Sequence, residues 1–124
     1  MPDIITTVEN VPVLVCGPDG EKIKSESETV DLIGETFGNN IEWIIVPVER
    51  FEDEFFELKT RVAGAIIQKF VTYRRRLVIL GDISRYTTTS RSFHDFVYEA
   101  NRGNQVWFLP DLQEFAGRLK HSKD

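Results

Sequence analysis

The stretch Leu77-Val78-Ile79-Leu80, which runs directly into a polar segment at residues 81–89, decides the fold class of this chain. Its four residues are all apolar, without polar residues at alternate positions, and this is typical of a strand covered on both faces. The stretches Trp43-Ile44-Ile45-Val46 and Val106-Trp107-Phe108-Leu109 have the same character. With helical segments between them, the three strands predict an α/β fold in which they run parallel and are joined by right-handed crossovers.

Four helices are predicted around these strands, from apolar residues at helical spacing and from residues that begin or end helices. Ser25 and Glu28 have the spacing of a capping box, and Gly103 follows the third helix as a C-cap. Pro110 and Asp111 are residue types that start a helix, and they precede the fourth. The helices are expected over residues 25–38, 53–73, 90–102 and 110–119. The second is the longest, and its apolar stripe is broader than one sheet contact requires.

An antiparallel hairpin is predicted before the first parallel strand. The apolar run at residues 11–16 is followed by the turn cluster Gly17-Pro18-Asp19-Gly20 and then by a second short strand at residues 21–24. Pro12 indicates an edge position for the first of these strands. The whole chain, residues 1–124, is therefore predicted to be a single domain with a core over about residues 11–119. It has a mixed sheet of about five strands, with Trp43 and Trp107 on neighbouring strands.

Composition excludes several classes of protein. The hydrophobic fraction of 41% fits a globular chain, and the net charge of -5 gives no basic face for nucleic acid. No apolar run approaches the roughly 20 residues of a membrane span, and Asp3 and Glu9 argue against a signal peptide. Cys16 is the only cysteine, and with two histidines it forms no zinc spacing. We therefore predict a cytoplasmic protein with no metal, no cofactor, no nucleic-acid partner and no membrane partner.

Several segments together resemble a bacterial family that is known as domain of unknown function 4180. The segments are Phe55-Phe56-Glu57-Leu58-Lys59-Thr60, Ala63-Gly64, Gln68-Lys69-Phe70, Gly81-Asp82-Ile83-Ser84-Arg85-Tyr86, Asp95-Phe96 and Glu99-Ala100-Asn101-Arg102-Gly103. The resemblance covers about residues 11–119. It implies a bacterial cytoplasmic protein, and it supplies no reaction and no catalytic residues.

The predicted order of elements is also similar to that of the STAS (anti-sigma-factor antagonist) fold, and this likeness is one of fold alone. The Asp-Ser-Ser-Gly segment that carries the phosphorylated serine of many STAS proteins is missing. Asp53-Glu54-Phe55-Phe56 stands near its place. A phosphorylation switch of that kind is therefore not expected.

The loop after residue 80 is the candidate binding site, because ligands of open α/β sheets bind at the carboxyl ends of the parallel strands. The loop is long, rich in hydroxyl groups, and opens a helix whose N-terminal amides favour an anion. The predicted ligand-binding residues are Asp82, Ser84, Arg85, Ser90 and Arg91. The alternative is a solvated loop in which Asp82 bonds a turn and Ser90 caps the helix.

Two classes of function stay open. The first is a non-catalytic binding or regulatory module for a small anionic ligand or a protein partner. The second is a small hydrolase-type enzyme that uses the loop at residues 82–91, with Ser84 and His94 as the residues to consider. We favour the module because no positioned acid, base or nucleophile pair is evident. The broad apolar stripe of the helix at residues 53–73 further predicts a homo-oligomer that forms through that helix.

Overall fold

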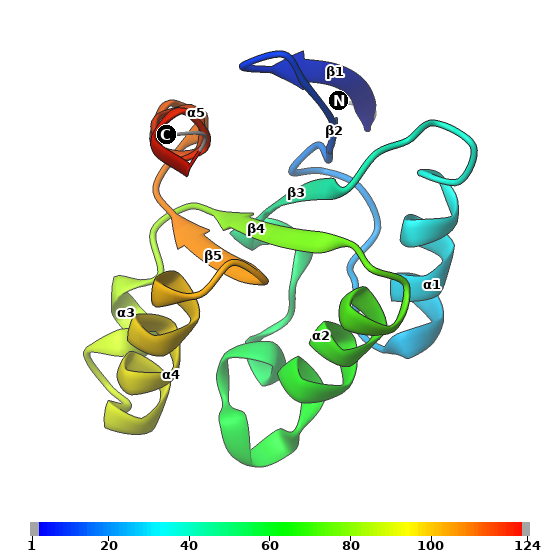
Figure 1. Ribbon diagram of the computed structural model, residues 1–124. Helices are drawn as coiled ribbons and strands as arrows, with labels where there is room; N and C mark the ends of the chain where they lie inside the picture. Colours follow the sequence, from blue (N-terminus) through cyan, green and yellow to red (C-terminus); the bar gives the residue numbers. More distant parts are fainter. Residues whose placement is uncertain (1–2, 123–124) are drawn as a thin grey trace.

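The computed structural model describes residues 3–122 and contains one mixed five-stranded sheet with the strand order β1-β2-β3-β4-β5 (Figure 1). The strands are β1 (Ile4–Val8), β2 (Val11–Val15), β3 (Trp43–Pro47), β4 (Arg76–Leu80) and β5 (Val106–Leu109). β1 pairs antiparallel with β2, and all other neighbours are parallel. The predicted α/β class, the mixed sheet and the three parallel strands are thus confirmed.

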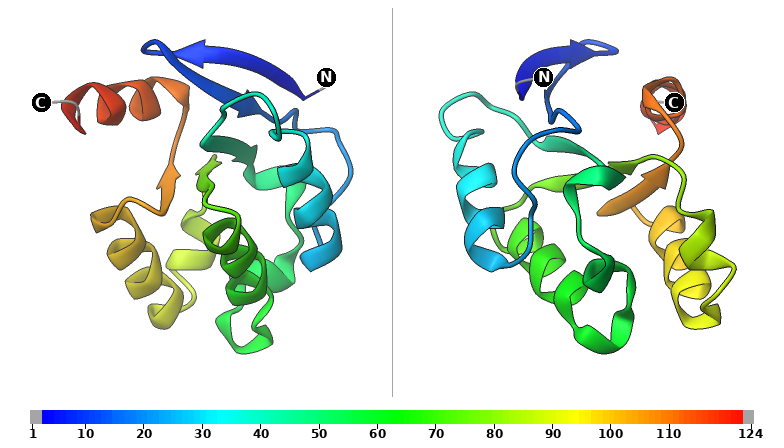
Figure 2. Two further views of the ribbon diagram at one scale, coloured as in Figure 1. Left: turned by 45° about the vertical axis from the view of Figure 1, so that its right-hand side comes forward. Right: turned by 180° about the vertical axis from the view of Figure 1, so that it is seen from behind.

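Most helices lie on one face of this sheet. They are α1 (Glu26–Gly34), α2 (Val62–Thr72), α3 (Ser84–Thr87), α4 (Arg91–Arg102) and α5 (Leu112–Ser122). Because β2 to β5 are parallel and adjacent in chain order, crossovers of one hand bring all the connecting helices to the same face. Figure 2 shows α1 to α4 on that face and α5 on the other. In residues 3–122, no helix has the length and apolar character needed to cross a membrane.

The sheet therefore has two cores of unequal size. The larger core, under α1, α2 and α4, includes Ile44, Leu77 and Phe70. The smaller core lies under α5 and contains Trp43, Trp107 and other buried residues. The prediction that the two tryptophans stand on neighbouring strands is wrong, because β4 separates β3 from β5. Their rings nevertheless lie 4.7 Å apart, since both project to the α5 face and meet above β4.

The antiparallel hairpin exists, but its strands are not those predicted. β1 pairs with β2, and Glu9 and Asn10 connect them with positive φ angles of 50° and 66°. Such values are typical of a two-residue turn that matches the twist of a hairpin. Residues 17–24, in contrast, form a loop that contributes only one isolated bridge, from Ile23 to Phe51. This loop does not reverse into a strand, because its carbonyl groups surround the Arg50 side chain.

Pro12 does not mark an edge strand, since β2 is the second strand of the sheet. β1 occupies the edge instead. Pro12 is tolerated because the ladder between β2 and β3 begins at Val13, so no hydrogen bond to β3 is lost at the proline nitrogen.

The predicted helix over residues 53–73 is wrong in its first half. Three short 3-10 turns, Val48–Arg50, Asp53–Phe56 and Leu58–Thr60, precede α2, and Arg61 separates them from α2 with a left-handed φ of 65°. An unbroken helix of that length would be about 30 Å long, whereas a five-residue strand spans roughly 17 Å. Folding the first half back lets Phe55 and Phe56 enter the core, where both are buried.

This break also removes the reason for expecting self-association through that helix, which was its exposed apolar stripe. Phe55, Phe56, Ala63, Ile66 and Phe70 are all buried within the chain itself. The broad stripe is thus covered by the larger core. Oligomer formation stays a prediction, and the stripe no longer requires it.

The capping box predicted at the first helix does not form: the Ser25 side chain makes no cap hydrogen bond to α1, and its Oγ donates to Glu28 Oε1 at 2.9 Å instead.

Local capping chemistry was predicted correctly at two other helices. Ser90 Oγ accepts a hydrogen bond from the Phe93 backbone amide at 3.1 Å and caps α4. Asp111 Oδ1 accepts one from the Glu114 amide at 2.9 Å at the start of α5. Both bonds satisfy amides that the first turn of a helix leaves without a partner.

Candidate functional site

A pocket of about 500 Å³ lies beyond the carboxyl ends of β3 and β4, between the 3-10 turns after β3 and the corner formed by α3 and α4. Parallel strands deliver their following segments to the same edge, so two stretches far apart in the sequence meet here. The pocket is lined by Asp53, Phe56, Glu57, Leu58, Lys59, Arg85, Tyr86, Thr89, Ser90 and Ser92. Two carboxylates, two cations and several hydroxyl groups thus share one cavity with an aromatic floor.

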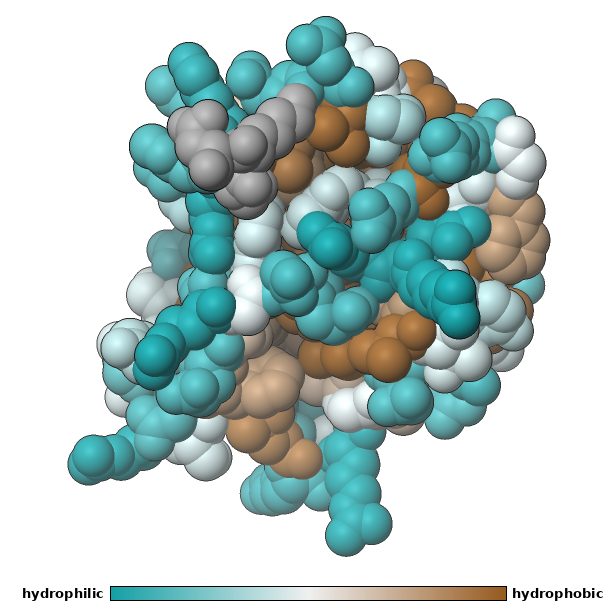
Figure 3. Space-filling model, in the orientation of Figure 1, coloured by the Kyte–Doolittle hydropathy of each residue, from teal (hydrophilic) through white to brown (hydrophobic). Residues whose placement is uncertain are grey.

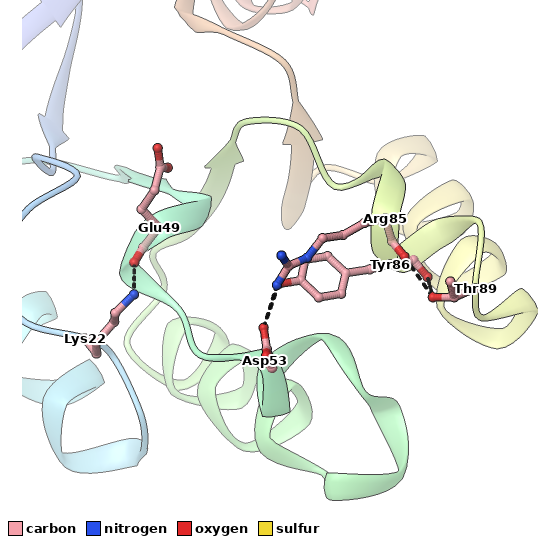
Figure 4. A network of polar contacts seen from close by, with 6 residues as sticks. All are labelled: Lys22, Glu49, Asp53, Arg85, Tyr86 and Thr89. Carbon is pink, nitrogen blue, oxygen red and sulfur yellow. Dashed lines mark hydrogen bonds and ion pairs between the residues drawn. The ribbon is translucent and has the colours of Figure 1, made fainter.

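Arg85 is held in place at the rim of this pocket. Its Nη2 donates to Asp53 Oδ1 at 2.8 Å and to the Tyr86 hydroxyl at 2.6 Å, and the Tyr86 hydroxyl donates to Asp53 Oδ1 at 2.9 Å. The guanidinium carbon lies 4.6 Å from the centre of the Tyr86 ring. Figure 4 shows Arg85 and Tyr86 side by side, both reaching from α3 toward Asp53.

Electrostatics favour the charged form of the arginine and the neutral form of the phenol. The hydrogen bond to Tyr86, and then the proximity of Asp53, raise the pKa of Arg85. Burial raises the pKa of Tyr86, and so does the hydrogen bond to Asp53. Tyr86 therefore stays protonated at neutral pH, where it can both accept from Arg85 and donate to Asp53.

The aromatic floor supports this arrangement from below. The rings of Phe56 and Tyr86 are stacked, with centroids 4.1 Å apart and an interplanar angle of 12°. Phe56 is buried and also contacts Phe93, the first apolar residue of α4. The site is thus attached to the larger core on both of its sides.

The structure brings together only part of the predicted site. Arg85 and Ser90 line the 500 Å³ pocket, whereas Asp82 and Ser84 line a neighbouring pocket of about 580 Å³. Asp82 and Arg85 also meet in a third pocket of about 410 Å³. Arg91 is exposed at the first position of α4 and is not among the residues that line either pocket. Binding by these residues is still a prediction.

Two of these residues also have the roles of the solvated-loop alternative. Asp82 Oδ1 accepts from the Ser84 amide at 2.9 Å, and the Ser84 hydrogen bonds lower the pKa of Asp82. Ser90 caps α4, as described above. The Thr88 and Thr89 hydroxyls donate to the backbone carbonyls of Ser84 and Arg85, at 2.7 and 2.8 Å. Much of the hydroxyl content of the loop therefore builds the α3 corner.

Sequence reasoning missed five of the residues that the site uses: Asp53, Glu57, Lys59, Tyr86 and Ser92. No local pattern connects the acidic run around Asp53 with the loop around Arg85. The available signal was positional: both segments directly follow parallel strands, so both reach the same sheet edge. Tyr86 also follows Arg85 directly, a pairing that permits stacking of the guanidinium on the ring.

The neighbouring 580 Å³ pocket contains both residues of the hydrolase alternative, Ser84 and His94. Among the described residues, however, no hydrogen bond joins their side chains. His94 Nδ1 lies 3.3 Å from Asp95 Oδ1, and the imidazole is exposed. Asn101, on the same helix, binds β5 instead: its Oδ1 accepts from the Phe108 amide at 2.7 Å, and its Nδ2 donates to the Phe108 carbonyl at 3.2 Å. A serine nucleophile needs its base within hydrogen-bond reach, and this geometry does not supply it.

Metal binding finds no support in the part of the chain that the structure describes. No group of three or more His, Cys, Asp or Glu side chains within residues 3–122 is arranged to hold a metal ion.

Fold and site together define a small α/β domain with a mixed five-stranded sheet and a polar pocket at the carboxyl edge of its parallel strands. The chain belongs to the family described as domain of unknown function (DUF4180), whose model matches residues 8–119. Neither the curated proteins nor the solved structures contain a match. The likeness to the STAS fold is therefore not confirmed.

Proposed function

We propose that this chain is a non-catalytic binding module and that its ligand is a small anionic molecule held in the 500 Å³ pocket. The observation that carries the proposal is that Arg85 is held by two hydrogen bonds and still has donor atoms to offer. Asp53 and Tyr86 both contact its Nη2 atom. A guanidinium has donors on three nitrogens, so within the described residues the bonds of Arg85 leave Nε and Nη1 for a ligand. An arginine fixed in this way loses little side-chain entropy when it binds a carboxylate or phosphate.

The charges of the pocket narrow the class of ligand. Lys59 and Arg85 can pair with an anionic group, whereas Asp53 and Glu57 would repel it. A ligand that pairs with both cations and both carboxylates must carry an anionic group and also an ammonium or hydroxyl donor. Amino acids and phosphorylated sugars have both. The hydroxyl groups of Ser90 and Ser92 supply further partners at the same wall.

Replacing Arg85 with Ala is expected to abolish the ligand-induced rise in melting temperature while leaving the fold intact. A thermal-shift screen with inorganic phosphate, phosphosugars and amino acids is the measurement. Arg85 is exposed, so its removal has little effect on the stability of the free protein. The Arg85→Ala, Arg91→Ala double variant tests the two predicted arginines together, and because only Arg85 lines the pocket it should behave like Arg85→Ala alone.

Arg102→Ala is the matched control. Arg102 is another exposed helical arginine, it pairs with Glu99 at 3.8 Å, and it lies outside the pocket lining. Its loss changes the net charge equally and should leave the ligand response unchanged. The proposal fails if Arg85→Ala keeps the full response, or if the two variants lose it to the same extent.

A protein partner and a hydrolase are the competing functions. A partner that docks on this edge would contact the exposed rim of the pocket, and it would show no thermal shift with small molecules. Hydrolysis would require Ser84 and His94 to approach each other in the neighbouring pocket. Turnover of a chromogenic ester that Ser84→Ala abolishes and Arg85→Ala preserves would establish the enzyme in place of the module.

A further inference from the structure

Within residues 3–122, no strand pairs with the outer edge of β1. β1 pairs with β2 on one side and is the last strand of the sheet on the other. Its residues are Ile-Ile-Thr-Thr-Val, without charge and without proline. Proteins usually protect such an edge with Lys, Pro, a bulge or a covering segment, and β1 carries none of the first three in its five residues.

The turn geometry fixes which backbone groups face outward. In a hairpin with a two-residue turn, the residues that flank the turn exchange hydrogen bonds, and the pattern then alternates along the strand. Val8, Thr6 and Ile4 therefore direct their amides and carbonyls toward β2. Ile5 and Thr7 direct theirs away from the sheet.

The exposed side chains of β1 are apolar or β-branched. Ile4 is 47% exposed and Ile5 is 51% exposed, and these are among the largest exposures of apolar residues in the described chain. Figure 3 shows apolar surface at the upper end of the molecule, around the β1–β2 hairpin. Ile4 and Thr6 stand beside Val15 and Val13, on the face of the sheet that α5 covers only in part.

We propose that β1 is the interface for a second copy of this chain, with the two β1 strands paired antiparallel about a two-fold axis at Thr6. In this register Ile5 exchanges two hydrogen bonds with the partner's Thr7, and the symmetric pair gives two more. Ile4 stands opposite the partner's Val8, so every residue of β1 is paired. The result is one continuous sheet across two copies, with both α5 helices on the same face.

Three features favour a second copy as the occupant. First, the outward-facing residues are two apart and centred on Thr6, so the strand is complementary to itself in the only register that pairs all five residues. Second, each cross-strand pair is apolar or β-branched, and such pairs stabilise sheets. Third, the acid at the start of the strand is neutralised, because Asp3 Oδ1 lies 3.0 Å from Arg50 Nη1. It therefore does not repel the partner's Glu9, which this register places opposite it.

The test uses charge at the symmetry axis. Thr6→Lys and Thr6→Glu each place two like charges directly opposite each other in the dimer, at an exposed position of the monomer. Sedimentation equilibrium at high micromolar concentration should give twice the chain mass for the natural sequence and the single chain mass for each variant. An equimolar mixture of the two variants should return to twice the chain mass, because Lys now faces Glu.

A second variant tests the backbone bonds. Thr7→Pro removes an outward amide and leaves the bonds between β1 and β2 in place, so it should also give a monomer with an unchanged circular dichroism spectrum. Val71→Lys on α2, at an exposed apolar residue of the segment first expected to associate, should leave the dimer intact. A monomeric natural sequence overturns the proposal, and so does a dimer that survives Thr6→Lys. The readout is the mass of the free protein, so it is independent of ligand binding at Arg85.

Discussion

Replacing Arg50 with Ala is expected to lower the free energy of unfolding by about 3–5 kcal/mol, the usual cost of removing one partner from a buried ion pair. Arg50 is only 6% exposed. Its Nη1 donates to Asp3 Oδ1 and to the Gly17 carbonyl, each at 3.0 Å, and its Nε donates to the Glu21 carbonyl at 2.6 Å. One side chain thus joins the start of β1, the loop after β2 and the segment after β3.

The loss is large because three acceptors lose their donor at once. Asp3 would keep its bond from the Gly17 amide, but its charge would stand uncompensated in a largely buried position. The loop is also built closely around the arginine: a Cβ atom on Gly20 would lie 2.6 Å from the guanidinium carbon. Gly20→Ala should therefore destabilise the fold as well, by displacing the same side chain.

Urea denaturation monitored by circular dichroism measures this effect. Arg102→Ala is the control for loss of a positive charge at the surface, and it should change the free energy of unfolding by less than about 0.5 kcal/mol. Arg50→Lys keeps the charge but cannot reach three acceptors, so its loss should be intermediate. A change below about 1 kcal/mol for Arg50→Ala would mean that water replaces the guanidinium, and the structural role would be refuted.

The thiol of Cys16 should react with a disulfide reagent such as dithiobis(nitrobenzoate) more than about tenfold more slowly in the folded protein than in denaturant, at about pH 8. Burial, reinforced by the nearby Asp3 carboxylate, raises the pKa of Cys16 from 9.0 to about 12. The thiolate is the reactive form, and each pKa unit reduces its population about tenfold below the pKa. The steric effect of burial adds to this figure.

The same shift sets the direction of a pH effect on stability. The folded chain holds the Cys16 proton more tightly than the unfolded chain, so this contribution is fully present below about pH 9 and is lost as the pH rises toward 12. Cys16→Ser serves as the control for this pH effect, because it removes the titrating group.

For the thiol reaction, a folded protein that reacts within tenfold of the denatured rate would contradict the raised pKa of Cys16.

The parts of the fold that were predictable are those whose structure is decided by neighbouring residues. The central residues of β3, β4 and β5 are apolar and buried, and this part of their sequence reflects cover on both faces of the sheet. The caps at Ser90 and Asp111 depend on a bond across three residues. Such features need no knowledge of the rest of the chain.

The parts that were not predictable depend on contacts between distant residues. β1 is exposed at four of its five positions, so neither alternation nor burial distinguishes it from a polar end. The helix expected at residues 53–73 has the correct apolar spacing throughout. It is interrupted at Arg61, whose φ of 65° is left-handed, and its first half folds back so that Phe55 and Phe56 reach the core, a contact that only the assembled fold provides.

The candidate site also has a part that was predictable from the sequence and a part that was not. The loop around Arg85 was found from its position after β4 and from its composition. Its partner Asp53 lies 32 residues earlier in the chain, and no local pattern connects the two. The ligand-binding role of the loop residues stays a prediction that the Arg85→Ala measurement tests.

Because the two sheet faces are covered unequally, the tryptophan fluorescence of this protein reports on one face only. Trp43 and Trp107 are its only tryptophans, and both lie on the α5 face, within 5.3 and 6.2 Å of the Phe115 ring of α5. Intrinsic fluorescence therefore monitors the attachment of the last helix, whereas circular dichroism averages over all the helices. If α5 detaches before the larger core unfolds, the two signals will separate along a denaturant series, and the chain will reveal its order of disassembly without any added label.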